Sequence, residues 1–239
     1  MSVDRLARPE PSRPRRRRAA PGPAADDVLV VGLGRFGSAL ADELVALGHG
    51  VLAVDADPEL VQRHADRFDQ VVVADATNAE ALRQLGAGEF RQAVVGIGGD
   101  IEASILTVLA LLDCGVPNVW AKAITAEHGR ILERVGAHHV VFPEMEMGRR
   151  VAHLVTNRML DYIALDDRLV LVEVPVPASL AGATLRSAGV REHHGVTVVC
   201  VKPAGGGYRM SHPDWELRDG DTLLVAGPPE VAEAFGRLA

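Results

Sequence analysis

The chain has 239 residues, 48% hydrophobic and 4% aromatic, which is enough for one large domain or two modest ones with their own cores. So few aromatic rings disfavour nucleic-acid recognition by base stacking, and no apolar run approaches the roughly 18 residues that a membrane span needs. The two distant cysteines, Cys114 and Cys200, argue against a disulfide framework or thiolate metal site and suit a reducing cytosol.

The N-terminal segment differs from the rest in charge. Residues 1–25 carry seven arginines against Asp4 and Glu10, whereas the whole chain has a net charge of −7. The segment is also rich in proline and lacks apolar periodicity, so we predict that residues 1–26 form a disordered basic tail. Four consecutive arginines, 15–18, could contact anionic lipid or nucleic acid, but a solvated tail is the favoured interpretation.

From residue 27 to residue 143, strand and helix patterns alternate. The sequence predicts short apolar strands at 28–31, 51–54, 71–73, 93–95, 119–121 and 140–141. Between them it predicts five helices. One spans 36–47, one begins at Pro58, one ends at Leu85, and the last two span about 101–113 and 126–135. Strands alternating with helices in this way predict an α/β fold, a Rossmann-type doubly wound parallel sheet covered on both faces.

The pattern changes after residue 143. Residues 144–165 form an amphipathic stretch without a breaker, which predicts a helical linker. Strands then dominate, at 169–174, 196–202, 208–210 and 222–226, separated by glycine-rich and aspartate-rich turns. Residues 166–239 are therefore expected to form a second, small α+β domain.

The first strand ends in the spacing Gly32-x-Gly34-x-x-Gly37, the dinucleotide-binding fingerprint. Gly32 allows a tight turn, Gly34 a close approach of the backbone to phosphate, and Gly37 close packing of helix on sheet. The helix N-terminus offers free N–H groups to the anion. Asp55, at the end of the second strand, is placed to accept hydrogen bonds from ribose hydroxyls and to repel the 2′-phosphate of NADP.

Three further residues near the fingerprint join the candidate site. Phe36 lies inside the motif, and Asp57 caps the helix that begins at Pro58. Arg35 stands where most dinucleotide enzymes have a small residue. A guanidinium there would extend beyond the shared phosphates to a terminal phosphate or to a ligand on a neighbouring subunit. The alternative is a solvated arginine at a helix start.

The stretches "VVGLGRFGSAL", "VLAVDADPELV", "VVVADATNAEAL", "NVWAKA" and "GAHHVVFPEMEMG" together resemble the KtrA and TrkA proteins, with the last pointing to KtrA. These are cytosolic RCK (regulator of potassium conductance) subunits, and the resemblance covers residues 27–239. It implies a non-enzymatic homodimer that assembles into an octameric ring under a membrane potassium-translocating subunit. ATP and ADP, or NAD(H), would set the shape of the ring. It also implies a cytoplasmic protein, peripheral to the inner face of the cell membrane.

The resemblance assigns roles to individual residues. Gly32, Gly34 and Gly37 would hold phosphates and Asp55 the ribose, while the adenine side would be lined by Asp75, Ala76 and Thr77. Gly98 would close the pocket, and Arg35 would sense the ATP γ-phosphate. Glu144 matches an acidic residue that helps to bind an activating divalent cation, Mg²⁺ or Ca²⁺. The alternative for Glu144 is an acid favoured by the helix dipole.

The C-terminal module resembles an RCK domain that binds cyclic di-AMP in some relatives. Arg191, His193 and His194 precede the strand "VTVVCV", near where that ligand would lie, although a surface turn explains them equally well. The competing hypothesis for the whole chain is an NAD-dependent oxidoreductase. The remaining 75 or so residues are short for a substrate domain and show no catalytic constellation. A nucleic-acid-binding function is not expected, because the body of the chain is acidic and poor in aromatic residues.

Overall fold

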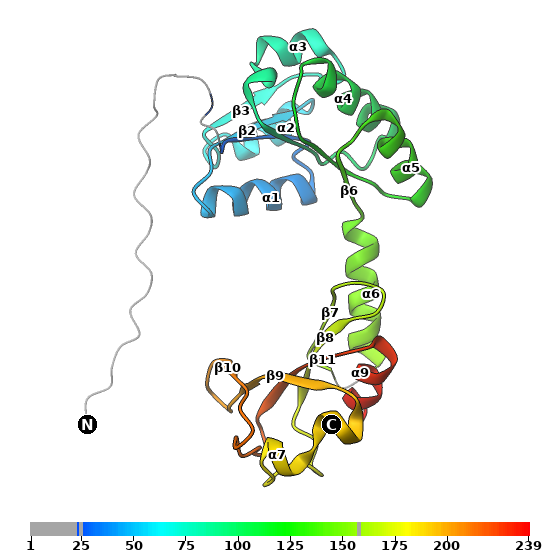
Figure 1. Ribbon diagram of the computed structural model, residues 1–239. Coiled ribbons are helices and arrows are strands. Elements are labelled where there is room, and N and C mark those ends of the chain that lie inside the picture. The colour runs from blue at the N-terminus through cyan, green and yellow to red at the C-terminus, as the bar shows by residue number, and fades with distance from the viewer. Residues whose placement is uncertain (1–22, 24–25, 157–158) are drawn as a thin grey trace, which may run out of the picture. The chain divides into compact units, whose positions relative to one another are not determined.

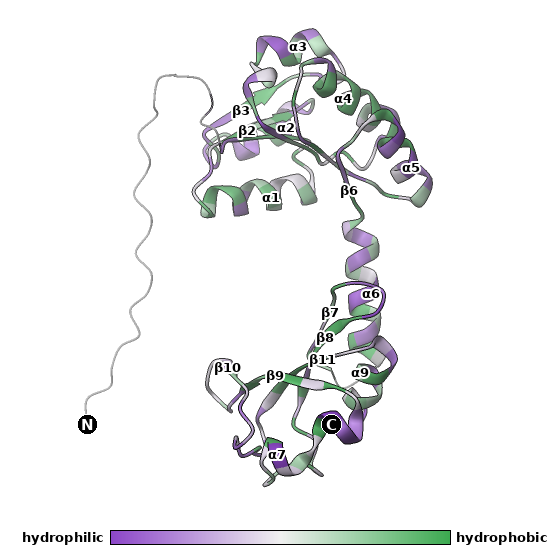
Figure 2. Ribbon diagram, in the orientation of Figure 1, coloured by the Kyte–Doolittle hydropathy of each residue, from purple (hydrophilic) through white to green (hydrophobic). Residues whose placement is uncertain are grey.

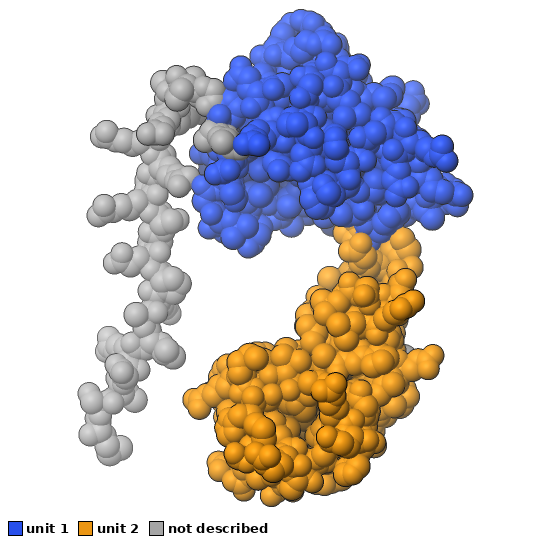
Figure 3. Space-filling model, viewed as in Figure 1, with its two compact units in different colours: residues 1–142 blue, residues 143–239 orange. Residues whose placement is uncertain are grey.

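The computed structural model describes residues 23, 26–156 and 159–239 (Figure 1). Residues 1–22 and 24–25 of the predicted tail lie outside the described residues. The chain divides into two compact units, residues 1–142 and residues 143–239 (Figure 3).

The first unit is built on a six-stranded parallel sheet with the order β3-β2-β1-β4-β5-β6. Its strands are β1 (Val28–Val31), β2 (Val51–Asp55), β3 (Gln70–Val73), β4 (Gln92–Val95), β5 (Val119–Lys122) and β6 (His139–Val141). Its helices are α1 (Arg35–Ala46), α2 (Pro58–His64), α3 (Ala79–Gln84), the short 3₁₀ helix η1 (Ala87–Glu89), α4 (Ile101–Asp113) and α5 (Ala126–Val135). The predicted Rossmann-type sheet is confirmed.

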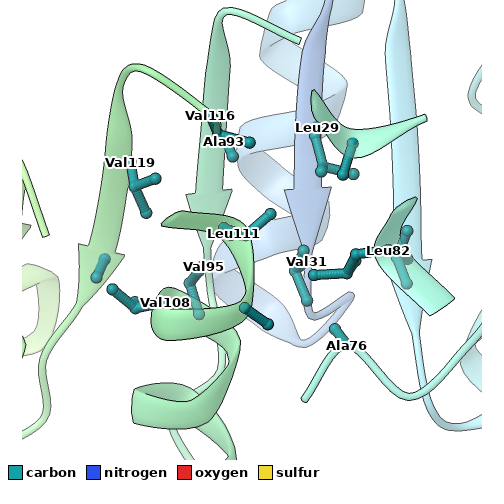
Figure 4. Close-up of a cluster of buried hydrophobic side chains, with 14 of the residues drawn as sticks. Leu29, Val31, Ala76, Leu82, Ala93, Val95, Val108, Leu111, Val116 and Val119 are labelled. Atoms are coloured by element: carbon teal, nitrogen blue, oxygen red, sulfur yellow. The ribbon is translucent and has the colours of Figure 1, made fainter. Parts of the chain in front are cut away.

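Alternating side chains of the central strands enter two different cores. On one face, Leu29, Val31 and Val95 pack with Leu82 of α3 and Leu111 of α4 (Figure 4). The opposite face carries a second cluster, Val28, Val30, Leu33, Ala41, Val51, Ala53, Val61 and Phe68, which includes residues of α1 and α2. Because both faces are covered, β1 is apolar along its whole length and β2 is apolar as far as Val54, rather than alternating (Figure 2).

Side-chain caps fix where several helices of this unit begin. The carboxylate of Asp57 accepts a hydrogen bond from the Glu59 N–H at 2.8 Å, and Pro58 occupies the first helical position of α2. Asp100 caps α4 through the Ala103 N–H at 2.9 Å. Each cap satisfies a backbone donor that the helix cannot satisfy itself.

The second unit combines helices with an antiparallel sheet of order β10-β9-β11-β8-β7. Its strands are β7 (Asp161–Ala164), β8 (Val170–Pro175), β9 (Thr197–Lys202), β10 (Arg209–Met210) and β11 (Thr222–Gly227). Its helices are α6 (Pro143–Thr156), α7 (Leu185–Ala188), α8 (Val190–His194) and α9 (Pro229–Gly236). The core of this unit is made by strand residues such as Val172, Val201 and Leu223 together with Phe235 of α9. This is the small α+β domain that the sequence predicts.

The predicted helix over 144–165 is wrong in its second half. The described part of α6 ends at Thr156, and residues 161–164 form β7, in which Tyr162 pairs with Val172 of β8. Tyr162 is buried in the core of the second unit, and its ring stacks on His153 of α6 at 3.9 Å. Arg150 holds Asp161 through two hydrogen bonds of 2.8 and 2.7 Å. Pairing with β8 therefore overrides the helical periodicity of the sequence.

Candidate functional site

The loop after β1 lies at the point where the strand order reverses, since β1 is flanked by β2 on one side and β4 on the other. Ligands of open α/β sheets bind at this switch point, beyond the carboxyl ends of the strands. Gly32 has φ +93°, a left-handed conformation that favours glycine, and its N–H donates to Val54 O at 2.8 Å. On the other side, the Gly96 N–H donates to Val31 O at 2.7 Å. The loop is thus anchored to both neighbouring strands.

The other two fingerprint glycines differ in what surrounds them. A Cβ on Gly37 would come within 1.8 Å of the Gly32 carbonyl oxygen, so Gly37 is needed for α1 to pack on the loop. A Cβ on Gly34 would meet nothing within 4 Å among the described residues, and Gly34 has φ −62°. The fold therefore does not require glycine at position 34.

Asp55 is fixed by the glycine loop itself. One carboxylate oxygen accepts a hydrogen bond from the Leu33 N–H at 2.6 Å, and the other accepts one from the Asp57 N–H at 2.9 Å. Leu33 lies between two of the fingerprint glycines, so the carboxylate joins the end of β2 to the loop after β1. The sequence suggested a ribose acceptor here but did not indicate this structural bond.

A cavity of about 230 Å³ opens at the switch point. It brings together seven of the residues predicted from sequence: Gly32, Gly34, Asp55, Asp75, Ala76, Thr77 and Gly98. It is also lined by Val31, Ala56, Ala74, Gly96, Ile97, Ala103 and Thr107, which the sequence analysis did not single out. Ala103 and Thr107 belong to α4. In the sequence, this side of the cavity is indicated only by a small residue and a polar residue one turn apart on the otherwise apolar helix α4.

On the β3 side of the cavity, Asp75 is held by the residue two positions further along. The hydroxyl and the backbone N–H of Thr77 donate to the same oxygen of Asp75, at 2.7 and 3.0 Å. These two hydrogen bonds lower the pKa of Asp75, because they favour the ionised form. The carboxylate at this edge is therefore charged at neutral pH.

Four candidates lie outside the cavity lining. Arg35 and Phe36 occupy the first turn of α1, where Arg35 is exposed, and Gly37 is buried beneath the loop. Asp57 caps α2. The Phe36 ring has a cation near it, with Lys122 Nζ 5.7 Å from the ring centroid.

The candidates of the second unit are spread over two helices. Glu144 lies in the first turn of α6, and within the described residues no group of three or more His, Cys, Asp or Glu side chains is placed to hold a metal ion. Arg191, His193 and His194 belong to α8, where the His194 ring lies edge-on to Phe235 at 5.3 Å. A cavity of about 480 Å³ in this unit is lined by other residues, among them Arg209, Trp215 and Arg218.

A Rossmann-type unit with a cavity at its switch point, followed by a small α+β unit, defines the RCK class of two-domain proteins. Family models match the chain as a TrkA-N domain over residues 28–143 and a TrkA-C domain over residues 169–239. The chain belongs to the family of the Ktr system potassium uptake proteins. It is 36% identical to Ktr system potassium uptake protein A of Bacillus subtilis over 207 residues, which cover 86% of this chain and 93% of that protein.

Other similar proteins are a second Ktr protein and two solved structures. Identity to Ktr system potassium uptake protein A of Vibrio alginolyticus is 35%, covering 84% of this chain and 92% of that one. The solved GsuK channel shares the fold with a TM-score of 0.66 at 20% identity, covering 92% of this chain and 40% of that chain. The solved GsuK RCK domain has a TM-score of 0.63 at 20% identity, and the match covers 92% of this chain and 48% of that chain. This chain thus spans about half or less of these two solved chains. Within its described part, no helix is long and apolar enough to cross a membrane.

Proposed function

We propose that this protein is a nucleotide-sensing regulatory subunit of a Ktr-type potassium uptake system and not an enzyme. It would act in the cytoplasm, at the inner face of the cell membrane, through a membrane potassium-translocating subunit. The observation that carries the proposal is the cavity at the switch point, in a chain whose relatives are potassium uptake proteins.

The cavity supports an adenine nucleotide as the ligand. Its volume is below the roughly 300–1,000 Å³ usual for whole drug-sized ligands, so it suits the adenosine half, with the phosphates at the open mouth. Asp55 is placed to accept from the ribose hydroxyls. Both Thr77 bonds use one oxygen of Asp75, which leaves the other oxygen for a donor such as the adenine amino group.

The phosphates would then meet the loop and the start of α1. Gly34 is the N-cap of α1, lines the cavity and leaves open space there, and the first-turn N–H groups of a helix have no partners within the helix. ATP and ADP are our first candidates. NAD(H) stays a second one, because a GsuK channel of this fold is described as bound to NAD.

We further propose that the subunits form a ring of dimers, an octamer, in which Arg35 reads the γ-phosphate of ATP. Arg35 is exposed and lies outside the cavity lining, so it suits a ligand held by an adjacent subunit. Several large apolar side chains of α4, α5 and the loop between β5 and α5 are exposed, which supports self-association: Ile101, Leu106, Leu109, Ile124 and Ile131.

Two accessory ligands complete the proposal. Glu144 would contribute one carboxylate to a Mg²⁺ or Ca²⁺ ion, with the remaining ligands supplied by nucleotide phosphates and a second subunit. Cyclic di-AMP would bind the C-terminal domain near Arg191, His193 and His194. Calorimetry with each ligand on the purified protein tests both assignments.

The function is tested by potassium flux through the reconstituted complex. The wild type should respond differently to ATP and ADP, while Arg35→Ala should bind ADP as before and lose the ability to switch with ATP. Arg91→Ala is the matched control, because Arg91 is exposed and precedes β4, at the edge of the sheet opposite to the cavity. An Arg35→Ala protein that still distinguishes ATP from ADP would contradict the role of Arg35. A wild type that binds no adenine nucleotide, or that turns over NADH, would contradict the function.

A further inference from the structure

A buried histidine on α5 has no role in the function described so far. His128 is only 1% exposed, and its Nε2 atom has no hydrogen-bond partner among the described residues. Buried polar groups are normally hydrogen-bonded, so an unpartnered ring nitrogen in the interior is unusual. Histidine is also the side chain whose charge ordinarily changes between pH 5 and 8. His128 is therefore a candidate for a group that responds to pH.

The other ring nitrogen closes the turn between β5 and α5. His128 Nδ1 accepts a hydrogen bond from the Ile124 N–H at 3.4 Å, and the Thr125 hydroxyl oxygen accepts one from the backbone N–H of His128 at 3.1 Å. Because Nδ1 accepts, the proton of the neutral ring lies on Nε2. A second proton would have to go onto Nδ1, where it would face the N–H of Ile124, donor against donor. Protonation therefore breaks the contact between the ring and Ile124.

The surroundings of the ring do not compensate a positive charge. The elements packed against α5 include α4 and β6. Their charged and titratable side chains are exposed to solvent, as are those of α5 apart from His128: Glu102 and Asp113 on α4, His139 on β6, and Glu127, Arg130, Glu133 and Arg134 on α5. Lys122, which is buried at the end of β5, has the same sign of charge as a protonated ring. Burial lowers the pKa of His128, and no charged group of the described residues contributes to this shift. A protonated ring must therefore move toward water, or the turn must move away from it.

The turn that His128 closes carries part of the proposed self-association surface. Ile124 lies in this turn and Ile131 lies on α5, and each is 43% exposed. They stand four residues before and three residues after His128 in the chain. The hydrogen bond joins the backbone of Ile124 itself to the ring, so breaking it displaces Ile124 directly.

We infer that His128 makes self-association through α4 and α5 depend on pH, because protonation of its ring withdraws Ile124 from the apolar surface. The inference rests on the proposed function, since it takes the exposed apolar residues of α4 and α5 to be the contact between subunits. A second subunit that packs on Ile124 also holds the turn against Nδ1. The assembled protein therefore binds this proton less readily than a free subunit does.

The sign and the size of the effect follow from linkage. Because free subunits bind more protons, lowering the pH must weaken the assembly. The association constant falls by up to about 10-fold per pH unit for each histidine that titrates. A contact between two subunits contains two copies of His128, so it weakens by up to about 100-fold per pH unit.

The experiment measures the mass of the full chain by light scattering over a concentration series at pH 7.5, 6.5 and 5.5. We expect the concentration at which the wild type half-dissociates to rise by at least about 10-fold from pH 7.5 to pH 5.5. In His128→Asn, the amide oxygen can accept from Ile124 and cannot be protonated in this range, so the change should be less than about threefold. His128→Gln, which is also neutral, gives the same prediction if His128→Asn does not fold.

His64→Asn is the matched control. His64 is also buried, and burial lowers its pKa too, but it lies on α2 and not on the proposed surface. This variant should keep the full pH response of the wild type. Ile131→Ser tests the surface itself and should weaken the assembly at all three pH values. Circular dichroism of the same samples reports whether the helices remain folded.

The possible failures are distinguishable. If the wild type does not self-associate at any pH, or Ile131→Ser associates as the wild type does, the proposed assembly fails and this inference fails with it. If the wild type assembles equally at pH 7.5 and 5.5, or His128→Asn keeps its pH response, only the role of His128 is wrong. Dissociation in step with loss of the helical signal, or a pH response that His64→Asn also removes, would reduce His128 to a stability residue and overturn the inference.

Discussion

The second fingerprint glycine offers the sharpest test of the binding site, because Gly34→Ala separates folding from ligand binding. The added Cβ would meet nothing within 4 Å among the described residues, and a backbone with φ −62° and ψ −174° suits alanine. It would, however, project into the space where the phosphates are proposed to lie. We expect a protein that folds as the wild type does and binds nucleotides poorly.

The effect on stability should be close to zero because two small terms oppose each other. Replacing glycine at a compatible backbone position stabilises a protein by about 0.4–1 kcal/mol through the unfolded chain. Gly34 is also the N-cap of α1, where alanine is worse than glycine by an amount of similar size, roughly 0.5–1 kcal/mol. The Tm should therefore stay within about 3 °C of the wild type.

The effect on affinity should be much larger. A methyl group at Gly34 would keep the phosphate from the loop N–H groups, and each charge-assisted hydrogen bond to an anion contributes about 1.5–3 kcal/mol. We therefore expect the affinities for AMP, ADP and ATP each to fall by roughly 10-fold or more. Calorimetry measures the affinities and a thermal melt without nucleotide measures stability.

Gly37→Ala is the matched comparison for this prediction. Its Cβ would come within 1.8 Å of Gly32 O, so α1 must move away from the loop. Overpacking of this kind costs about 1–3 kcal/mol, which corresponds to a Tm lower by roughly 2–12 °C. A Gly34→Ala protein that binds nucleotides as tightly as the wild type would show that the phosphates do not pass over this loop.

Three further predictions concern charged and titratable groups. Asp55→Ala should weaken the binding of all adenine nucleotides by about 1.5–3 kcal/mol in calorimetry. The control Asp69→Ala removes the carboxylate that accepts from the Val51 N–H at the other end of β2, and it should not weaken binding. Unchanged ATP affinity of Asp55→Ala would refute the role of Asp55. Glu144→Gln should keep nucleotide affinity but lose the Mg²⁺ or Ca²⁺ enhancement of potassium flux, with Glu146→Gln as the control in the same helical turn; a persisting cation response would leave Glu144 as a helix-start acid. Burial lowers the pKa of both His64 and His128 below 6.5. The unfolded chain therefore binds protons that the folded protein does not, so the free energy of unfolding should fall as the pH drops through 6.5. Urea titrations at pH 7.5 and 5.5 should show a smaller loss of stability for His128→Gln than for the wild type, and an equal loss would contradict this.

Most of the first unit could be predicted from the sequence, because its signals are local. The run Val28–Val31 is apolar along its whole length and Val51–Asp55 is apolar up to its last residue, and helices such as α2 begin at recognisable caps such as Asp57. The three fingerprint glycines also indicate where the loop after β1 lies. Each of these features depends on a few neighbouring residues, so one sequence is enough to show it.

The end of the predicted linker helix could not be found in this way. Residues 159–165 have apolar side chains at spacings that fit a helix as well as a strand. The strand forms because Met159 and Tyr162 are buried in a core built from residues up to Phe235, and because Arg150 binds Asp161. Such contacts between distant parts of the chain are not visible in local periodicity.

Within the site, the sequence indicated both the groups that every adenine nucleotide would meet and Arg35, the group proposed to distinguish between nucleotides. The glycine loop, Asp55 and Asp75 would contact the adenosine and the first phosphate, which AMP, ADP and ATP share. A ligand shifts a two-state assembly only through its differential affinity for the two states, so these contacts alone cannot switch a ring. The discriminating groups must lie further along the phosphate chain. Arg35 is exposed beyond the cavity, so in the proposed function ATP would be told from ADP where a second subunit meets the first.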